Sequence, residues 1–482
     1  MKVLFIQNLG INESLALTDL SAFLKSKGHA CDLLIEKNEK NLYNSIRKFS
    51  PDIFIIPWDI GALSWVLKIT YKIKDNFTKP IVFCGTYPSF YPSNAINCPC
   101  VEIICIGETE YALLELIEKL EKKEDVSKIK NLWIKKEGKI YKNELRTLIA
   151  DLNTIPLPDR GIYFKYRYLK EFGLKRFTSG RGCSNSCSFC YNPLLRQRYE
   201  GKGSYVRRKS VARIIQEIED VRKQSKLTSV HFSDDIFISD KDWIREFSRE
   251  YKQKINLPFT CNASAELIDE DVIDLLKSAH CSGIAIGTET GNENLRNFIL
   301  NKKITNHQII EAGRLVKKYK LFLTTFNMVA LPEETIENAF ETVKLNAKIN
   351  ADHARLSFAF PLPETKLAEY GLKNGFFDKA HIERLLDNTI FPNNAILNSK
   401  YKKQFENLFY LFHFGVKFPL LIPLIKKILS LRLVKIFSLL NLLINNYYEK
   451  KFFNITLYSG IKYILCAGNY KNRTKVFNNY MP

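Results

Sequence analysis

Residues 178–193 read Thr-Ser-Gly-Arg-Gly-Cys-Ser-Asn-Ser-Cys-Ser-Phe-Cys-Tyr-Asn-Pro, and this stretch decides how the rest of the chain is interpreted. Within it, Cys183, Cys187 and Cys190 form a C-x3-C-x2-C array. Three thiolates on one loop can bind three irons of a cubane cluster, one fewer than the usual four-cysteine complement. The fourth iron then stays open to a substrate or cofactor, which a cluster that only transfers electrons does not need.

Two other interpretations of the array are a chance grouping of cysteines and a partial zinc site. Zinc sites usually have four ligands, often in C-x2-C pairs, and no second cysteine or histidine pair follows at a fitting distance. Gly180 and Gly182 suit a cluster loop, because a backbone without Cβ can fold tightly around a bulky group. The array therefore favours an iron–sulfur cluster.

The length and cysteine content indicate a large chain in a reducing setting. Its 482 residues exceed one typical domain and can bury sizeable cores. The apolar run after Met1 is too short for a signal peptide and is typical of a first strand. A reducing, cytoplasmic location is therefore expected, and in such a location the eleven cysteines are expected to be free thiols.

The net charge of +21 is unevenly distributed. Residues 401–482 contain 13 Lys or Arg and two Glu, a net charge of +11 and about half of the total. Such an excess is found in proteins that bind nucleic acid or a membrane surface, and also in proteins from lysine-rich proteomes. Because the charge is concentrated there, residues 396–482 are the candidate segment for such binding.

Residues 1–125 alternate short apolar runs with helical patterns, which indicates a parallel, doubly wound sheet. In such sheets ligands bind beyond the carboxyl ends of the strands. Residues 126–165 are predicted to form a hairpin around Glu137-Gly138 and a proline-containing linker.

A second strand–helix series occupies residues 166–395. Six strand-helix units predict a partial barrel with active residues at the carboxyl ends of its strands. The expected strands are residues 176–179, 229–233, 259–263, 283–288, 322–329 and 355–360. The cysteine loop follows the first of them, and acidic or glycine-rich turns follow the second, fourth, fifth and sixth.

The cysteine array resembles that of the radical SAM superfamily, in which the open iron of a [4Fe-4S] cluster binds S-adenosylmethionine. Two further segments are similar to motifs of that family. Residues 232–237 resemble its Phe-x-Asp-Asp-x-Phe stretch, and residues 287–291 resemble its Gly-x-Glu-Ser-Gly turn. The resemblance implies cofactor contacts from Phe189, Asp234, Asp235, Gly287 and Glu289.

Two departures from the family pattern concern the same site. Glu333 stands where a glycine is usual, and Ser264 stands where an arginine is common. From the residues alone, Asp234 and Asp235 could also cap a turn, and Glu289 could be a solvated strand end.

The first sheet resembles the cobalamin-binding domain found in a subgroup of radical SAM enzymes. Residues 85–92 look like the subgroup's Gly-Gly-x-His-Pro-Thr segment, and residues 107–110 look like its Gly-Glu-Gly-Glu turn. The resemblance implies a cobalamin held by Gly85, Thr86, Tyr87, Gly107 and Glu108. Thr86 and Tyr87 replace the second glycine and the histidine, and no Asp-x-His-x-x-Gly motif is present to ligate cobalt from below. Ordinary turn glycines are the alternative.

The resemblance implies methylation of an unactivated carbon of a small-molecule or lipid-like substrate, with electrons from a reductant such as flavodoxin or ferredoxin. The alternatives are a radical oxidative cyclase or rearrangement enzyme, and an RNA-modifying methylthiotransferase with a second cluster at Cys98 and Cys100. A nucleic acid partner is not expected, because no C-terminal RNA-binding barrel is recognisable. Cys84 and Cys105 lie within apolar strands and are predicted to be core residues.

Residues 396–482 are predicted to be helical, basic and apolar. Their uncharged stretches are far shorter than the roughly 20 residues that span a bilayer. Two interpretations are open: a segment that lies peripherally on a membrane surface, or a helical cap packed on the barrel.

Overall fold

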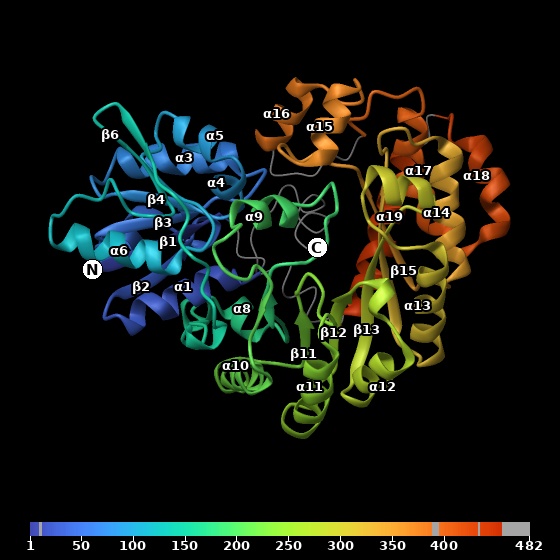
Figure 1. The fold of residues 1–482 in the computed structure, drawn as a ribbon, viewed down its shortest axis with the longest axis horizontal. Helices are drawn as coiled ribbons and strands as arrows, with labels where there is room; N and C mark the ends of the chain where they lie inside the picture. Colours follow the sequence, from blue (N-terminus) through green and yellow to red (C-terminus); the bar gives the residue numbers. More distant parts are fainter. Residues whose placement is uncertain (9–11, 388–394, 432–433, 456–482) are drawn as a thin grey trace.

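The computed structural model describes residues 1–8, 12–387, 395–431 and 434–455. Two α/β units lie side by side in Figure 1, the N-terminal unit on the left and the second unit on the right, with α17 and α18 of the C-terminal region on the right-hand side. This is the fold class that the sequence predicts.

The first sheet has seven strands in the order β2-β1-β3-β4-β5-β6-β7. The first five in this order are parallel, and the last two add an antiparallel hairpin. The predicted hairpin therefore extends the first sheet rather than standing beside it. The strands are β1 (Lys2–Gln7), β2 (Ala30–Ile35), β3 (Ile53–Pro57), β4 (Ile81–Cys84), β5 (Ile103–Cys105), β6 (Leu132–Lys136) and β7 (Lys139–Lys142).

Helices cover both faces of this sheet, because alternate residues of its strands are apolar on both sides. Val3 and Phe5 pack with α1 and α6, whereas Leu4 and Ile6 pack with α2, α3 and α5. Cys84 and Cys105 are buried in the core as predicted. The helices are α1 (Leu15–Ser26), η1 (Glu36–Asn38), α2 (Leu42–Phe49), α3 (Leu63–Lys74), α4 (Thr86–Phe90), α5 (Pro92–Asn97) and α6 (Glu110–Glu121).

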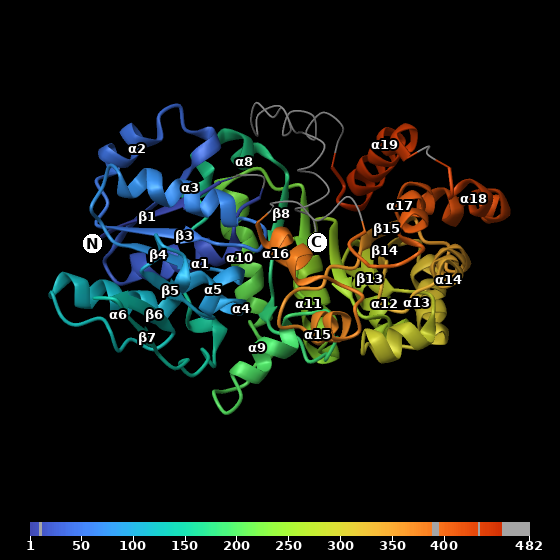
Figure 2. The ribbon, with the colours of Figure 1, turned by 90° about the horizontal axis from the view of Figure 1, so that it is seen from above.

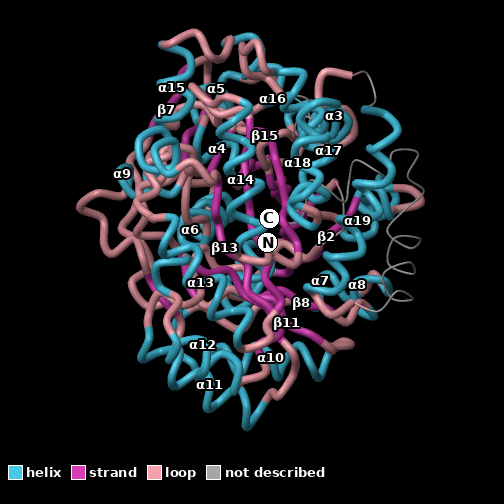
Figure 3. Tube along the Cα trace, turned by 90° about the vertical axis from the view of Figure 1, so that its right-hand side faces the viewer, coloured by secondary structure: helices cyan, strands magenta, loops and turns pink. Residues whose placement is uncertain are grey.

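The second sheet has six parallel strands in the order β15-β14-β13-β12-β11-β8. Its edge strands β8 and β15 do not pair, so the sheet forms an open, partial barrel. Figure 3 shows its strands in the interior with helices around them. The strands are β8 (Leu174–Phe177), β11 (Ser229–Phe232), β12 (Phe259–Ala263), β13 (Cys281–Glu289), β14 (Phe322–Val329) and β15 (His353–Phe358). They match the six predicted strands to within a few residues.

The helices between these strands have regular N-caps. Thr305 and Thr335 each begin a helix with a capping box, in which side chain and backbone satisfy each other's hydrogen bonds. The remaining elements of this part are η2 (Leu152–Thr154), α7 (Gly161–Phe164), α8 (Arg167–Glu171), β9 (Gly180–Arg181), α9 (Asn192–Arg198), β10 (Arg207–Arg208), α10 (Val211–Gln224), α11 (Lys241–Lys254), η3 (Ala265–Leu267), α12 (Glu270–Ser278), η4 (Leu295–Ile299), α13 (Asn306–Lys318), α14 (Ile336–Lys348), α15 (Lys366–Lys373) and α16 (Lys379–Asp387).

The C-terminal region is helical and packs on the barrel. Its elements are α17 (Lys402–Lys417), η5 (Pro419–Leu421), α18 (Ile422–Ile428) and α19 (Val434–Phe452). Near the end of α19, Glu449 forms an ion pair with Arg355 of β15 at 3.4 Å, and the Phe453 carbonyl accepts a hydrogen bond from Ser229 of β11 at 3.0 Å. Among the described residues, no helix combines the length and apolarity needed to cross a bilayer. The predicted cap is therefore present in this region, and part of the basic tail (residues 456–482) lies outside the described residues.

Candidate functional site

The cysteine loop begins where two short strands approach each other closely. Gly180 and Arg181 of β9 pair with β10, and the loop then runs from Gly182 to the start of α9. Gly182 has φ of +89°, and a Cβ there would lie 2.3 Å from the carbonyl oxygen of Tyr205. A Cβ at Gly180 would lie 2.6 Å from the carbonyl oxygen of Arg207. The two glycines therefore let the loop start against β10.

Backbone N–H groups of the loop point at the sulfur atoms. The N–H of Asn185 donates to Cys183 Sγ at 3.4 Å, and the N–H of Asn192 donates to Cys190 Sγ at 3.5 Å. Such donors stabilise a thiolate bound to iron. Burial raises the pKa of all three thiols, that of Cys187 to about 12, so metal binding has to displace their protons.

The cysteines line a cavity of about 250 Å³ on the sheet side of the loop, here called the sheet-side cavity. It gathers the cysteines and all five residues for which the sequence predicts contacts with S-adenosylmethionine. Its lining comprises Cys183, Asn185, Cys187, Phe189, Cys190, Asn192, Ser233, Asp234, Asp235, Ile236, Asn262, Ala263, Ser264, Ala285, Gly287, Glu289, Lys302 and Phe326. Within the described residues, no three His, Cys, Asp or Glu side chains surround one metal-ion position. A cubane differs from such a site, because each thiolate binds its own iron.

Glu289 and Lys302 form an ion pair in the wall of this cavity. Lys302 Nζ lies 2.9 Å from Glu289 Oε1 and donates to the Gly287 carbonyl at 2.7 Å. Burial opposes the charge of Lys302, but the neighbouring Glu289 carboxylate holds its pKa above the usual value. A Cβ at Gly287 would lie 2.3 Å from Glu289 Oε1 and 2.4 Å from Lys302 Nζ, so a larger residue there would displace the ends of these two side chains. Sequence reasoning missed Lys302, because nothing in the Lys302-Lys303 run distinguishes it from a surface lysine.

The two aspartates after β11 have different surroundings. Asp234 is buried and accepts hydrogen bonds from the Ser179 N–H at 2.9 Å and the Ser179 hydroxyl at 2.6 Å, so it fixes the start of the cysteine loop. Asp235 faces the cavity and is reached by solvent, and desolvation nevertheless raises its pKa. Ser233 Oγ and Asn262 Oδ1 are buried polar atoms without a hydrogen-bond partner in the described protein. These groups are the ones that a polar ligand in the cavity can use.

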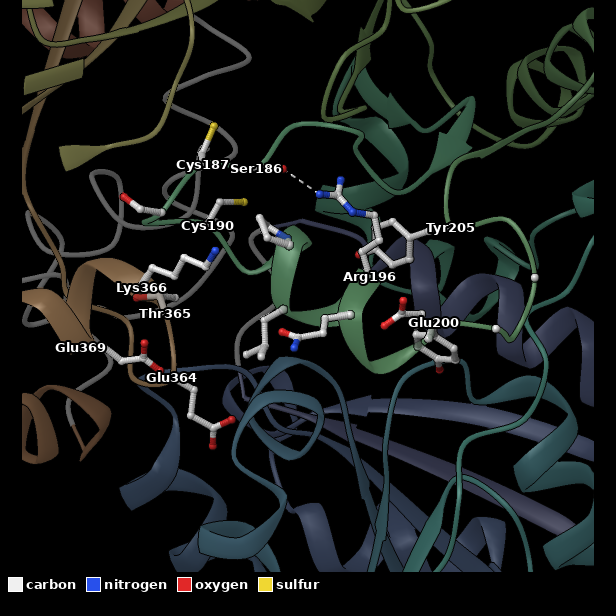
Figure 4. A pocket seen from close by; sticks show the side chains of 17 residues that line it. Ser186, Cys187, Cys190, Arg196, Glu200, Tyr205, Glu364, Thr365, Lys366 and Glu369 are labelled. Carbon is white, nitrogen blue, oxygen red and sulfur yellow. Dashed lines mark hydrogen bonds between the residues drawn. The ribbon is translucent and has the colours of Figure 1, made fainter. Parts of the chain in front are cut away.

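Arg196 of α9 holds the first turn of the cysteine loop. Its guanidinium donates to the carbonyl oxygens of Cys183 at 3.1 Å, Ser184 at 2.6 Å and Asn185 at 3.2 Å, and to Ser186 Oγ at 2.8 Å. Figure 4 shows the side chain reaching from its helix to the loop. No motif in the sequence identifies this arginine.

Arg196 also lines a larger cavity of about 730 Å³ on the outer side of the loop, here called the helix-side cavity. Cys187 and Cys190 line both cavities, so the cysteine loop separates them. On its far side this cavity is bordered by Glu364, Lys366 and Glu369 at the start of α15.

The predicted cobalamin residues at the end of β4 pack against the residues that follow β3. Gly85 has φ of +110°, and a Cβ there would lie 3.1 Å from the Trp58 carbonyl oxygen. Tyr87 stacks on the Trp58 indole with ring centroids 4.4 Å apart. The Thr86 hydroxyl donates to Asp59 Oδ1 at 3.3 Å, and Asp59 retains access to solvent although desolvation raises its pKa.

The predicted residues at the end of β5 connect the two units. A Cβ at Gly107 would lie 1.8 Å from the Tyr199 hydroxyl oxygen, so the second unit occupies the space that glycine leaves. Glu108 Oε1 forms ion pairs with Arg181 and Arg207, each at 2.9 Å. The contacts of Gly107 and Glu108 are therefore contacts to the cysteine-loop region, and their part in cobalamin binding stays a prediction.

The turn after β14 explains one departure from the family pattern. Glu333 has φ of +66°, the left-handed conformation that glycine adopts most readily. Its neighbour Glu334 is buried, accepts a hydrogen bond from the Leu331 N–H at 3.1 Å, and has an unpartnered Oε1 in the described protein. Burial raises the pKa of Glu334 to about 8. Ser264, the other departure, donates to Glu266 at 2.6 Å.

We expect Glu334 to make folding less favourable as the pH rises. Below about pH 4.5 the carboxyl is protonated in both states. Between about pH 4.5 and 8 the unfolded chain loses this proton while the folded chain keeps it, so the free energy of unfolding falls by up to ~1.4 kcal/mol per pH unit. Glu334→Gln removes the titration and should flatten the decline. Urea unfolding of both proteins at three pH values across this window measures it.

Comparing the variant with wild type cancels the titration of other groups. Burial lowers the pKa values of His231, His353 and His413, and these contribute equally in both proteins. Glu333→Gln, in the exposed neighbouring position, is the matched control and should retain the wild-type slope. An identical slope in Glu334→Gln and wild type would contradict the expectation.

One protein-family model and two curated relatives illustrate what this chain is similar to. The family model described as Radical SAM superfamily matches residues 177–345. An uncharacterized methyltransferase of Pyrococcus horikoshii is 29% identical over 338 residues, which cover 68% of this chain and 71% of that protein. Cytidylyl-2-hydroxyethylphosphonate methyltransferase of Streptomyces wedmorensis is 19% identical over 385 residues, covering 71% and 70% of the two chains.

A solved structure extends the likeness to both units. The radical S-adenosylmethionine methyltransferase TsrM of Kitasatospora setae, solved with cobalamin and a [4Fe-4S] cluster bound, superposes with a TM-score of 0.64. The match covers 77% of this chain and 78% of that one at 17% sequence identity. At this identity the likeness concerns the fold.

Proposed function

We propose that this chain, which carries a radical SAM domain, is a cobalamin-dependent enzyme that methylates an unactivated carbon. The main support for the proposal is a single cavity at the carboxyl ends of the strands. It is lined by the three cysteines and by the five residues predicted to contact S-adenosylmethionine. Methyltransferases among the relatives and the two-unit fold support the same reaction class.

The residues of the sheet-side cavity fit a cluster and a polar cofactor. Cys183, Cys187 and Cys190 would hold three irons of a [4Fe-4S] cluster. The Asp235 carboxylate suits an ammonium group, and Ser233 and Asn262 bring buried polar atoms that lack protein partners. S-adenosylmethionine has an amino group, a carboxylate and ribose hydroxyls for such partners.

For cobalamin, the carboxyl edge of the first sheet has groups that fit. Thr86 and Asp59 place polar atoms there beside the packed aromatic pair of Tyr87 and Trp58. The only histidine of residues 1–150 is His29, directly before β2 at the opposite, amino end of the strands. The proposal is therefore a cobalamin without a histidine ligand from this unit.

Bound together, the cluster and cobalamin supply reductive cleavage of S-adenosylmethionine and methyl transfer, chemistry that no side chain provides. The chain binds, orients and shields. Asp234 and Arg196 fix the cysteine loop, the Glu289–Lys302 pair shapes the cavity wall, and Phe189 adds an apolar surface beside the cysteines. A reductant such as flavodoxin or ferredoxin is part of the proposal.

The proposal is tested with enzyme reconstituted with iron, sulfide and hydroxocobalamin under anaerobic conditions. Incubation with methyl-deuterated S-adenosylmethionine and a reductant should transfer the label to cobalamin, as measured by mass spectrometry. Cobalamin that stays unlabelled while S-adenosylmethionine is cleaved would contradict methyl transfer. A product that gains oxygen or a ring instead of a methyl group would favour the cyclase alternative.

A further inference from the structure

An exposed apolar tip projects from the C-terminal helices. Leu420 is 95% exposed, and Phe418, Leu421 and Leu424 are 57%, 41% and 56% exposed. These four residues, here called the apolar tip, lie at the N-cap of η5, on η5 itself and on the first turn of α18. Figures 1 and 2 both place α18 at the outer end of the molecule, away from the first unit and from α9. Contiguous exposed leucines on a protein surface mark a contact site more often than single ones do.

The exposure of the apolar tip does not result from loose packing of the helix, because the other face of the same helix is buried. Ile422, Ile425 and Leu429 of this segment are 8%, 4% and 1% exposed. The segment is also tied to α17, where Asn407 Nδ2 donates to the Leu431 carbonyl at 3.0 Å. The helix thus has one face that packs on the protein and another that faces outward with leucines and lysines.

Basic residues are the only charged residues in the stretch of sequence that contains the tip. The sequence from residue 407 to residue 448 contains no Asp or Glu, and Lys426 and Lys427 directly follow the tip. Both lysines are exposed. Lys426 Nζ lies 3.7 Å from Glu337 Oε1 and over the Phe340 ring, and Glu337 is itself 65% exposed. An exposed pair of this kind is weak, so it leaves the lysine free to contact another anion.

We propose that the apolar tip inserts into the interfacial region of a membrane, with Lys426 and Lys427 at its anionic headgroups. Leucines and phenylalanine next to lysines are the composition of segments that lie in a membrane interface, and binding scales with apolar area and with attraction to anionic lipid. A second copy of the chain is a poorer occupant, because a two-fold contact would bring the same basic surface against itself. The proposal is independent of the reaction at the cysteine loop.

The test measures co-sedimentation of the reconstituted full-length protein with lipid vesicles. One set is pure phosphatidylcholine, and the other contains roughly 30% phosphatidylglycerol at about 0.1 M salt. Wild type should sediment with the anionic vesicles and much less with the neutral ones. Leu420→Ser/Leu424→Ser should lower the partition coefficient about tenfold or more, and Lys427→Glu should lower it for the anionic vesicles. Leu372→Ser, a 39% exposed leucine on α15, is the matched control and should bind as wild type does.

Three outcomes would overturn the proposal. One is wild type that does not sediment with anionic vesicles, and another is a double variant that sediments as wild type does. The third is a concentration-dependent dimer in light scattering without lipid that the double variant loses, because that result assigns the tip to a protein contact. The replaced side chains are exposed, so thermal unfolding and cleavage of S-adenosylmethionine should be unchanged, which separates this test from that of the proposed function.

Discussion

Replacing Cys183, Cys187 and Cys190 together by alanine is expected to abolish iron–sulfur binding and cleavage of S-adenosylmethionine. The three sulfurs are the proposed thiolate ligands and line the sheet-side cavity, whereas Asp234, Ser233 and Asn262 beside them offer oxygens, which suit a cubane poorly. Iron and sulfide content, the spectrum of the reduced cluster and release of 5'-deoxyadenosine measure the loss. All three readouts should fall to background.

The control for this experiment replaces Cys98 and Cys100, a second set of closely spaced cysteines. Cys98→Ala/Cys100→Ala alters two thiols at the end of α5, far along the chain from the cysteine loop. It should retain full iron content and full cleavage. Loss of half the iron in this control would instead indicate a second cluster, and continued cleavage by the triple variant would refute the assignment of the cysteine loop.

The local features of the fold could be predicted from the sequence because they depend on neighbouring residues. The apolar runs of β1, β3 and β4 and their bounding glycines predict a parallel sheet, and the structure has that sheet. The C-x3-C-x2-C spacing of the three cysteines is enough to predict the cysteine loop. The Asp-Asp pair and the Gly-x-Glu turn follow strands, and parallel strands bring their carboxyl ends to one edge.

Features that depend on contacts between distant segments could not be predicted. Lys302 reaches Glu289 only because η4 and the following turn return the chain to the end of β13. The sequence predicts a cobalamin contact for Glu108 but gives no sign that its carboxylate pairs with Arg181 and Arg207 from the second unit. A single sequence gives residue types and spacing, whereas these pairings depend on how the two sheets are docked.

The departures from the family pattern also show that a single sequence does not give the backbone conformation of a turn. Glu333 departs from the family pattern in sequence, and its positive φ is a backbone conformation that glycine adopts more readily than glutamate does. Placing a non-glycine residue in this conformation costs on the order of 1 kcal/mol of conformational free energy, which contacts in the surrounding structure can offset. The backbone conformation of this turn is therefore visible only in the coordinates.

Arg196→Met is expected to lower cluster retention strongly, because one guanidinium satisfies three loop carbonyls and the Ser186 hydroxyl. Hydrogen bonds to a charged group contribute roughly 1.5–3 kcal/mol each, so their loss lets the first turn of the loop open. Arg196→Lys keeps the charge but not the fork of donors, and should retain an intermediate amount of iron. Iron content after gel filtration and the rate of iron loss to a chelator measure these effects.

The charge of Arg196 has a second, separable consequence. For an assumed separation of roughly 10 Å and an effective dielectric of about 20, one positive charge would favour the reduced cluster by ~1.7 kcal/mol, or about 70 mV for one electron. The remaining cluster of Arg196→Met should therefore have a midpoint potential lower by tens of millivolts, while Arg196→Lys should stay near wild type.

Arg198→Met is the matched control on the same helix, because Arg198 donates to the Phe90 carbonyl of the first unit at 3.1 Å and not to the cysteine loop. Equal iron loss in the Arg196 and Arg198 variants would show that α9 acts only through its packing, whereas loss confined to Arg196 with a lowered potential requires the guanidinium at the loop.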